Sequence, residues 1–192
     1  PSHQFPLGCV LSAERRVELI RLARKHNFYI LEDDYDGEFR YGGSTLTPLY
    51  NLDAERVLYM GTFSKSLFPA LRIGFALVPR SLHQQWLDLR NAVDRQSSIL
   101  EQSALAAFFR DGKTDRHIKT MSGVYAKKRA ALIASVRQYF PVTTNILGEK
   151  AGIHVAIQVP GVQFDSVFRE HCAKNGIGIS PCRFYAFDEE FY

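Results

Sequence analysis

The chain has 192 residues, of which 46% are hydrophobic and 23% charged, and its net charge is +4. This length accommodates one large or two small domains, and the composition is ordinary for a globular protein. The modest positive charge does not by itself indicate a nucleic-acid partner. No apolar run reaches the roughly 18 residues that a membrane span needs. Three cysteines without metal-binding spacing indicate reduced thiols in a cytoplasmic protein.

The first half of the chain predicts helices that alternate with strands. A helix is expected from an N-cap at Ser12 to about Asn27, because apolar residues recur at helical spacing between them. Residues 28–31 and 56–61 are apolar, β-rich runs, and the strand–helix–strand pattern predicts that they pair in parallel. Residues 72–79 predict a third strand, buried on both faces because its apolar run is nearly continuous.

The second half predicts a smaller lobe of helices and strands. A helix capped by Ser81 is expected to carry Trp86 on an apolar, core-facing side. The remaining predicted elements are helices at 99–109, 114 to about 140 and 164–175, and strands at 143–147, 152–159 and 177–187.

Basic residues and a histidine in this half are given structural interpretations. The long helix carries a basic group that we interpret as a solvated face rather than as a DNA-binding surface: Lys119, Lys127, Lys128 and Arg129. His154 is expected to be packed or hydrogen-bonded rather than to bind a metal, because no cluster of ligands surrounds it in the sequence.

A lysine turn follows the second predicted strand. Lys65 stands there between two serines, and a lysine in that position can hold a carbonyl compound as a Schiff base. Thr62, Ser64 and Arg72 can bind a phosphate, because hydroxyls donate single hydrogen bonds and arginine donates a bidentate pair. A lysine beside a phosphate anchor indicates pyridoxal 5'-phosphate (PLP). For an isolated Ser-Lys-Ser, a solvated lysine in a turn is the alternative.

An acidic run follows the first predicted strand. If the two strands are neighbours they lie about 4.8 Å apart, so Asp33 and Lys65 can reach one small ring. A carboxylate beside a pyridine nitrogen keeps that nitrogen protonated, which makes the ring an electron sink. Tyr35 can donate a hydrogen bond to the phenolate oxygen of the same ring.

Two motifs carry a resemblance to a known family. The segments EDDYDGEFRY (32–41) and GTFSKSLFPALRIG (61–74) resemble fold-type-I aminotransferases, and more narrowly the aminotransferase-like domain of MocR-type regulators, a branch of the GntR family. The opening PSHQFPLG and the AGIH at 151–154 are similar to the same branch. The resemblance implies that Lys65 forms the internal aldimine with PLP. It also implies the other cofactor contacts: Asp33 with the pyridinium nitrogen, Tyr35 with the ring oxygen, and Arg72, Ser64 and Thr62 with the phosphate.

Two positions depart from the pattern of ordinary aminotransferases. Those enzymes usually show an Asp-x-x-Tyr spacing, whereas Asp33 precedes Tyr35 by two residues, which favours the regulator branch. Asp34 remains an alternative to Asp33 as partner of the ring nitrogen. Phe5 stands where many aminotransferases have an asparagine that touches the ring oxygen, so that contact is missing here.

The resemblance implies an α/β, fold-type-I PLP-dependent transferase-like fold. Residues 1–112 would be the second half of the PLP-binding large domain, and residues 113–192 a linking helix and an incomplete small α+β C-terminal domain. Because the chain begins without methionine inside a motif, we expect a fragment. Its parent would be a homodimer with an N-terminal winged-helix domain that binds DNA, and would sense PLP and a small amino compound.

Two alternatives to the regulator remain. The chain can be a fragment of a class I/II aminotransferase that acts on amino acids, or a structural fragment whose incomplete pocket binds nothing. In each case we expect little or no transamination by the fragment, because the residues that would hold a substrate carboxylate in register are missing.

Overall fold

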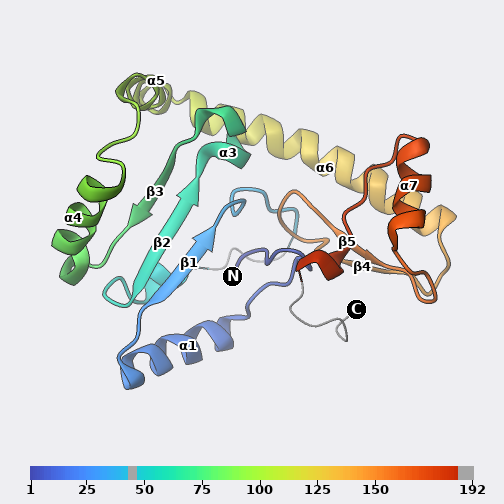
Figure 1. Ribbon diagram of the computed structural model, residues 1–192, viewed down its shortest axis with the longest axis horizontal. Helices are drawn as coiled ribbons and strands as arrows, with labels where there is room; N and C mark the ends of the chain where they lie inside the picture. Colours follow the sequence, from blue (N-terminus) through green and yellow to red (C-terminus); the bar gives the residue numbers. More distant parts are fainter. Residues whose placement is uncertain (43–46, 186–192) are drawn as a thin grey trace.

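A three-stranded sheet lies at the centre of the first half of the chain (Figure 1). The computed structural model describes residues 1–42 and 47–185. Strands β1 (Ile30–Asp34) and β2 (Val57–Thr62) are parallel, and β3 (Gly74–Leu77) runs antiparallel to β2, in the order β1-β2-β3. The predicted parallel pair is confirmed. The acids expected after the first strand lie inside it, because β1 begins two residues later than predicted and ends at an aspartate.

Helix α1 (Ala13–His26) covers one face of β1 and β2. Ser12 caps it as predicted, since its Oγ accepts from the backbone N–H of Arg15 at 3.3 Å. Asn27 ends it in the left-handed conformation (φ 54°). The buried apolar cluster joins α1, both strands and the short α2 (Leu49–Leu52): Ile20, Ala23, Ile30, Leu49 and Val57. Burial of this apolar surface supplies the main force that holds α1 on the sheet.

Two buried charged residues connect α1 and β1 to the neighbouring loops by hydrogen bonds. Arg16, only 2% exposed, donates to three backbone carbonyls at 2.9 Å: those of Pro1, Leu11 and Thr47. Glu32, 1% exposed, accepts at 2.9 Å from the backbone N–H groups of Leu49 and Tyr50. Each charge is therefore compensated inside the fold, as burial requires.

Strand β3 is less buried than expected. Phe75 and Leu77 are each 42% exposed, so the prediction of a strand buried on both faces is wrong for the described residues. The physical reason is that α1 packs on β1 and β2, and the core cluster contains no residue of β3. An apolar run predicts that a strand can be buried, but it does not predict which element packs against that strand.

Helices connect the sheet to the C-terminal part. α4 (His83–Val93) and α5 (Ile99–Arg110) lead into the long α6 (Lys113–Tyr139), which runs along one side of the molecule towards the C-terminal elements (Figure 1). Ser81 does not cap α4: a short 3-10 turn (Arg80–Leu82) comes first, and the Ser81 hydroxyl lies 3.3 Å from that of Tyr29. Among the described residues, no helix is long and apolar enough to span a bilayer.

The basic group of α6 divides into two kinds of residue. Its three lysines are exposed, in agreement with a solvated face. For Arg129 that interpretation is wrong, because its guanidinium is half-buried and donates to the backbone carbonyls of one turn. These are the carbonyls of Gly148, Glu149 (2.7 Å), Ala151 (3.1 Å) and Gly152 (3.4 Å). Arg129 therefore anchors α6 to this turn.

Beyond α6 the chain forms a small antiparallel pair, β4 (Asn145–Leu147) and β5 (Ala156–Gln158), followed by α7 (Ser166–Lys174). The predicted last strand is wrong over residues 177–185, where irregular chain precedes a 3-10 turn (Cys182–Tyr185). Pro181 interrupts this apolar run and cannot donate to a sheet. Residues 186–187 of that prediction lie outside the described residues.

Candidate functional site

The lysine turn begins where β2 ends. Thr62 Oγ1 accepts from the backbone N–H of Ser64 at 3.1 Å and thereby caps α3 (Phe63–Ser66), which carries Lys65. The Thr62 hydroxyl keeps its own proton for another acceptor. The Lys65 side chain is exposed, and within the described ranges it makes no hydrogen bond or ion pair. An amine in this position is free to react with a carbonyl compound.

Contacts with three other elements hold the lysine turn in place. The Phe63 ring lies 5.5 Å from that of Phe75 on β3 and 5.6 Å from that of Phe109 on α5. His117 of α6 donates from Nε2 to the carbonyl of Ser66 at 3.0 Å. The turn that presents Lys65 is thus braced by β3, α5 and α6.

Arg72 lies at the same edge of the sheet as Lys65. The backbone N–H of Phe63 donates to the carbonyl of Ile73 at 3.1 Å, which brings the segment of Arg72 alongside the start of α3. Arg72 adopts a left-handed conformation (φ 52°), which costs a residue with a side chain about 1–2 kcal/mol. Its side chain is exposed and, among the described residues, has no hydrogen-bond or ion-pair partner. Strained residues of this kind are common at functional sites.

The two aspartates that end β1 lie on opposite faces of the sheet. Asp34 Oδ2 accepts from the hydroxyl of Tyr59 at 2.9 Å, on the face that also carries the buried Glu32. Asp33 pairs with Met60 in the register and faces the other side, because side chains alternate along a strand. Its carboxylate is exposed and makes no hydrogen bond or ion pair in the described part of the chain. Of the two, Asp33 is the one without a hydrogen-bond partner among the described residues.

These residues converge on one edge because β1 and β2 are parallel. Their carboxyl ends meet at the end of the sheet beside α3 (Figure 1), where ligands of open α/β sheets bind. The predicted residues Lys65, Thr62, Ser64, Arg72 and Asp33 all belong to this edge.

Tyr35, the remaining predicted residue, uses its hydroxyl within the protein. Tyr35 Oη donates to the backbone carbonyl of His3 at 3.0 Å. Burial raises the pKa of Tyr35 to about 12, and the carboxylates of Asp36, Asp33 and Asp34 add to the effect. The phenol is therefore protonated at neutral pH, and its single proton is directed to the His3 carbonyl.

A histidine–aspartate pair beside Tyr35 was missed by the sequence analysis. His3 Nδ1 lies 3.0 Å from Asp36 Oδ2, and both side chains are almost completely buried. The Asp36 carboxylate also accepts from the backbone N–H of Ile153 at 3.2 Å. Both partners lie in the motifs that carry the resemblance, but nothing in the sequence joins residues 33 positions apart.

His154 completes a cluster whose ligand atoms lie within 4.8 Å of one another. It is hydrogen-bonded, as predicted, because its Nε2 donates to the carbonyl of Pro6 at 3.1 Å. Gly152 lies against the cluster: a Cβ on Gly152 would overlap the His3 ring and lie 2.5 Å from Asp36 Oδ2. The three side chains and Gly152 therefore form a closely packed joint.

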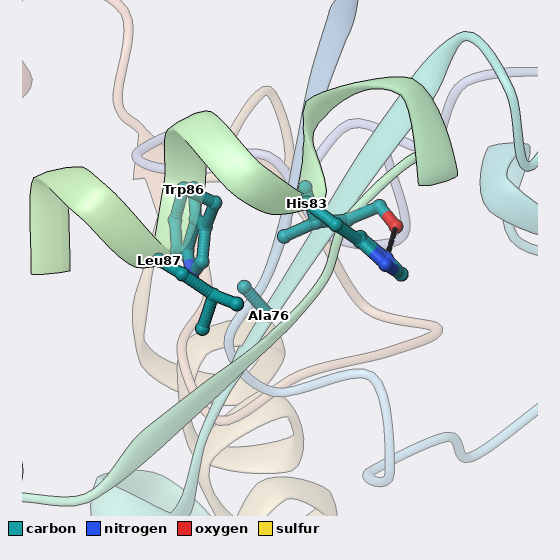
Figure 2. Close-up of a pocket in the computed structure, with 5 residues that line it drawn as sticks. Ala76, His83, Trp86 and Leu87 are labelled. Atoms are coloured by element: carbon teal, nitrogen blue, oxygen red, sulfur yellow. Dashed lines mark hydrogen bonds between the residues drawn. The ribbon is translucent and has the colours of Figure 1, made fainter.

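A surface pocket of about 250 Å³ lies between β3 and α4, away from this edge (Figure 2). Figure 2 shows His83, Trp86 and Leu87 of α4 facing Ala76 of β3. None of the predicted site residues lines it. The pocket is a gap in the packing of α4 on the sheet and is not the candidate site.

The architecture and the position of the lysine turn define the class of protein. The structure superposes on a Pyrococcus horikoshii kynurenine aminotransferase in complex with PMP with a TM-score of 0.86 and 26% identity, over 95% of this chain and 45% of that chain. The fold is therefore that of the fold-type-I PLP-dependent aminotransferases, as the motifs predicted.

The sequence comparison identifies the family. The chain belongs to the family Aminotransferase class I and II, which it matches over residues 2–191. It is 39% identical to the uncharacterized HTH-type transcriptional regulator YhdI of Bacillus subtilis, over 94% of this chain and 39% of that protein. It is 35% identical to the probable rhizopine catabolism regulatory protein MocR of Rhizobium meliloti, over 94% and 37%. The chain thus spans about two fifths of the length of these regulators, and the resemblance to MocR-type proteins is confirmed.

Proposed function

We propose that this chain is the PLP-binding, aminotransferase-like part of a MocR/GntR-type transcriptional regulator. The observation that carries the proposal is the exposed, unpartnered Lys65, which is held at the carboxyl edge of a parallel strand pair beside an equally unpartnered Arg72. The regulators YhdI and MocR are more similar to this chain, at 39% and 35% identity, than the aromatic-amino-acid aminotransferase 1 of Thermococcus litoralis, at 28%.

The residues at the edge fit PLP by their chemistry. PLP brings an aldehyde, a phosphate dianion, a pyridine nitrogen and a ring oxygen, and when bound it supplies an electron sink. Lys65 would hold the aldehyde carbon. Arg72, Ser64 and Thr62 would bind the phosphate, because they offer a free guanidinium and hydroxyl donors. Asp33 would accept from the protonated ring nitrogen, and Tyr35 would border the ring oxygen.

The charge balance supports the same assignment. Asp33, Lys65 and Arg72 have no ion-pair partner among the described residues, whereas the other acids of β1, Glu32 and Asp34, are hydrogen-bonded inside the fold. A ligand with a negative phosphate and a positive ring nitrogen complements the three free charges. A carboxylate beside the ring nitrogen favours its protonated form, on which the electron sink depends.

The regulator assignment extends to partners outside this chain. DNA would be bound through a winged-helix domain that these 192 residues do not include, and the parent protein would be a cytoplasmic homodimer. A small amino compound would be sensed together with PLP. We divide the chain at residues 112 and 113, where the long α6 begins, into part of the large domain and a small C-terminal domain.

A second candidate is a class I/II aminotransferase that acts on amino acids. The 28% identity to the Thermococcus litoralis enzyme over 94% of this chain favours it. A transamination assay of the full-length protein with a panel of amino acids separates the candidates. Turnover without DNA binding supports the enzyme, and sequence-specific DNA binding that responds to PLP supports the regulator.

Absorbance spectroscopy tests PLP binding directly. The full-length protein is incubated with PLP, freed of excess cofactor and scanned in the visible range. We expect a protein-bound band that is lost in Lys65→Ala and kept in Lys128→Ala, since Lys128 is an equally exposed lysine on α6. Borohydride reduction followed by peptide mass spectrometry should find the phosphopyridoxyl group on Lys65. Identical spectra for wild type and Lys65→Ala would show that the chain binds no PLP through this lysine.

The choice between the two aspartates has its own test. Asp33→Asn should weaken PLP binding at least tenfold, because it removes the charge that stabilises the protonated ring nitrogen. Asp34→Asn should change PLP affinity little, since its carboxylate is bonded to Tyr59 on the other face. Equilibrium titration of the two variants decides between them, and the reverse order of effects would assign the nitrogen to Asp34.

A further inference from the structure

We propose that His117 of α6 is a positioning residue for Lys65. By donating to the carbonyl of Ser66, it keeps the short helix α3 in the conformation that presents the Lys65 amine to PLP. This inference rests on the proposed PLP site. It goes beyond that site because it assigns a role to a residue 51 positions further along the chain than Ser66, which acts on the backbone and not on the cofactor.

Helix α3 depends on contacts with other parts of the fold. It has only four residues, and one backbone hydrogen bond closes it, from the N–H of Leu67 to the carbonyl of Phe63 at 2.8 Å. A single helical turn is not stable by itself, because fixing its backbone costs more than one hydrogen bond returns. Thr62 caps the N-terminal end. At the other end Leu67 leaves the helical conformation (φ −112°, ψ −91°), so the last carbonyls of α3 need donors from elsewhere.

His117 supplies such a donor to the carbonyl of Ser66. Ser66 is only 3% exposed, so water has little access to this end of α3. The imidazole Nε2 of His117 donates to the Ser66 carbonyl at 3.0 Å. A buried carbonyl that loses its donor costs the full penalty of its desolvation, which exceeds the net gain of an ordinary hydrogen bond. The conformation of α3 in which this carbonyl faces α6 is therefore favoured by His117.

The donor itself is held by its surroundings. The His117 ring lies 6.5 Å from the ring of Phe108 on α5, centroid to centroid, in an edge-to-face arrangement. Thr114, three residues earlier on the same side of α6, is only 4% exposed, so this end of the long helix is packed within the fold. A neutral imidazole with its proton on Nε2 and a protonated imidazole both donate from this nitrogen. The contact with Ser66 therefore does not require one charge state of His117.

The consequence for Lys65 is that its backbone lies between two fixed points, the Thr62 cap and the Ser66 carbonyl. The Lys65 side chain has no partner of its own among the described residues, so the backbone of α3 decides where the amine starts. To form the Schiff base, the unprotonated amine adds to the aldehyde carbon of PLP, and the aldehyde oxygen leaves as water. If α3 opens, a smaller fraction of the protein is competent for this step, and the apparent affinity for PLP falls by the same factor.

The first test is an equilibrium titration of the full-length protein with PLP, followed by the protein-bound visible band. We expect His117→Leu, which removes the donor, to weaken PLP binding about tenfold. His117→Gln keeps an N–H donor at the place of Nε2 and should restore the wild-type affinity. His171→Leu is the matched control, because His171 is an exposed histidine on α7, and it should bind PLP like wild type.

A measurement on cofactor-free protein separates positioning from general damage. Hydrogen exchange of the Leu67 amide reports on α3, because this amide makes the bond that closes the helix. It should exchange about tenfold faster in His117→Leu than in wild type, and at the wild-type rate in His117→Gln. The Ile30 amide, which bonds to the Arg56 carbonyl at 2.9 Å beside the core of the sheet, should exchange at the same rate in all three proteins.

The inference is overturned if His117→Leu changes only one of the two quantities, PLP affinity or Leu67 exchange, or neither. It is also overturned if His117→Gln binds PLP as weakly as His117→Leu, or if the Ile30 amide is accelerated as much as that of Leu67. If His117→Leu does not fold, His117→Asn takes its place, since its shorter amide cannot reach the Ser66 carbonyl from the position of Nε2. Absence of PLP binding in wild type would refute the proposed function instead, and the exchange measurement would still test whether His117 holds α3.

Discussion

Replacement of Gly152 by alanine should destabilise the protein strongly. The left-handed backbone (φ +68°) costs about 1–2 kcal/mol for a residue with a Cβ. The new methyl group would also overlap the His3 ring and lie 2.5 Å from Asp36 Oδ2, and overpacking of a filled interior costs about 1–3 kcal/mol. Together these terms reduce the free energy of unfolding by about 2–5 kcal/mol, which a denaturant titration measures.

Gly112→Ala is the matched control. Gly112 has nearly the same backbone conformation (φ +65°), but nothing lies within 4 Å of the place where its Cβ would be. The free energy of unfolding of Gly112→Ala should therefore fall only by the cost of the left-handed backbone, about 1–2 kcal/mol. The difference between the losses of unfolding free energy in Gly152→Ala and Gly112→Ala measures the cost of the overlap with His3 and Asp36. If both variants lose the same free energy to within about 0.5 kcal/mol, the typical error of such comparisons, the joint is not packed as described and the reasoning is refuted.

Three further predictions use the same denaturant titration. Arg16→Met should lower the free energy of unfolding by about 3 kcal/mol, because three backbone carbonyls lose their buried, charged donor; an unchanged value would contradict the role given to this guanidinium. Burial, with a smaller effect of His3, lowers the pKa of His154, so the folded state binds its proton less readily than the unfolded chain, in which a histidine titrates near about 6.5. The stability that neutral His154 contributes is therefore complete above that pH and is lost as the pH falls below it. In His154→Gln, the free energy of unfolding should decline less steeply as the pH is lowered. Ser12→Ala should lower the free energy of unfolding by about 1 kcal/mol through loss of the helix cap, whereas Ser103→Ala, at an exposed position inside α5, should not.

The parts of the fold that depend on local patterns could be predicted from the sequence. The parallel pairing of β1 and β2 follows from the order of apolar runs, and the start of α1 at Ser12 follows from its capping chemistry. The lysine turn was found because its residues are contiguous. The sequence analysis favoured Asp33 over Asp34, but the exposure of Lys65 and the face of β1 on which each aspartate lies needed the structure.

The features that the sequence could not predict all depend on distant contacts. Arg129 lies among exposed lysines on α6, and its contacts with the turn at 148–152 make it a half-buried donor. His3 and Asp36 contact each other directly although they are 33 positions apart, and Gly152, more than a hundred residues further along the chain, packs against both. The burial of β3 was overestimated for the same reason, because an apolar run does not specify the element that packs against it.

The distribution of partners among the polar residues supports the location of the site independently of any motif. Buried charges in this fold are compensated internally, as Arg16, Glu32 and Asp36 illustrate, which is the rule for residues whose role is structural. Within the described ranges, Lys65, Arg72 and Asp33 depart from that pattern and gather at one edge of one sheet. Arg72 is in addition held in a strained conformation that no internal contact of its side chain explains. We therefore keep the proposed site for a charged ligand at the carboxyl ends of these strands, where two cations and one carboxylate lie together without internal partners.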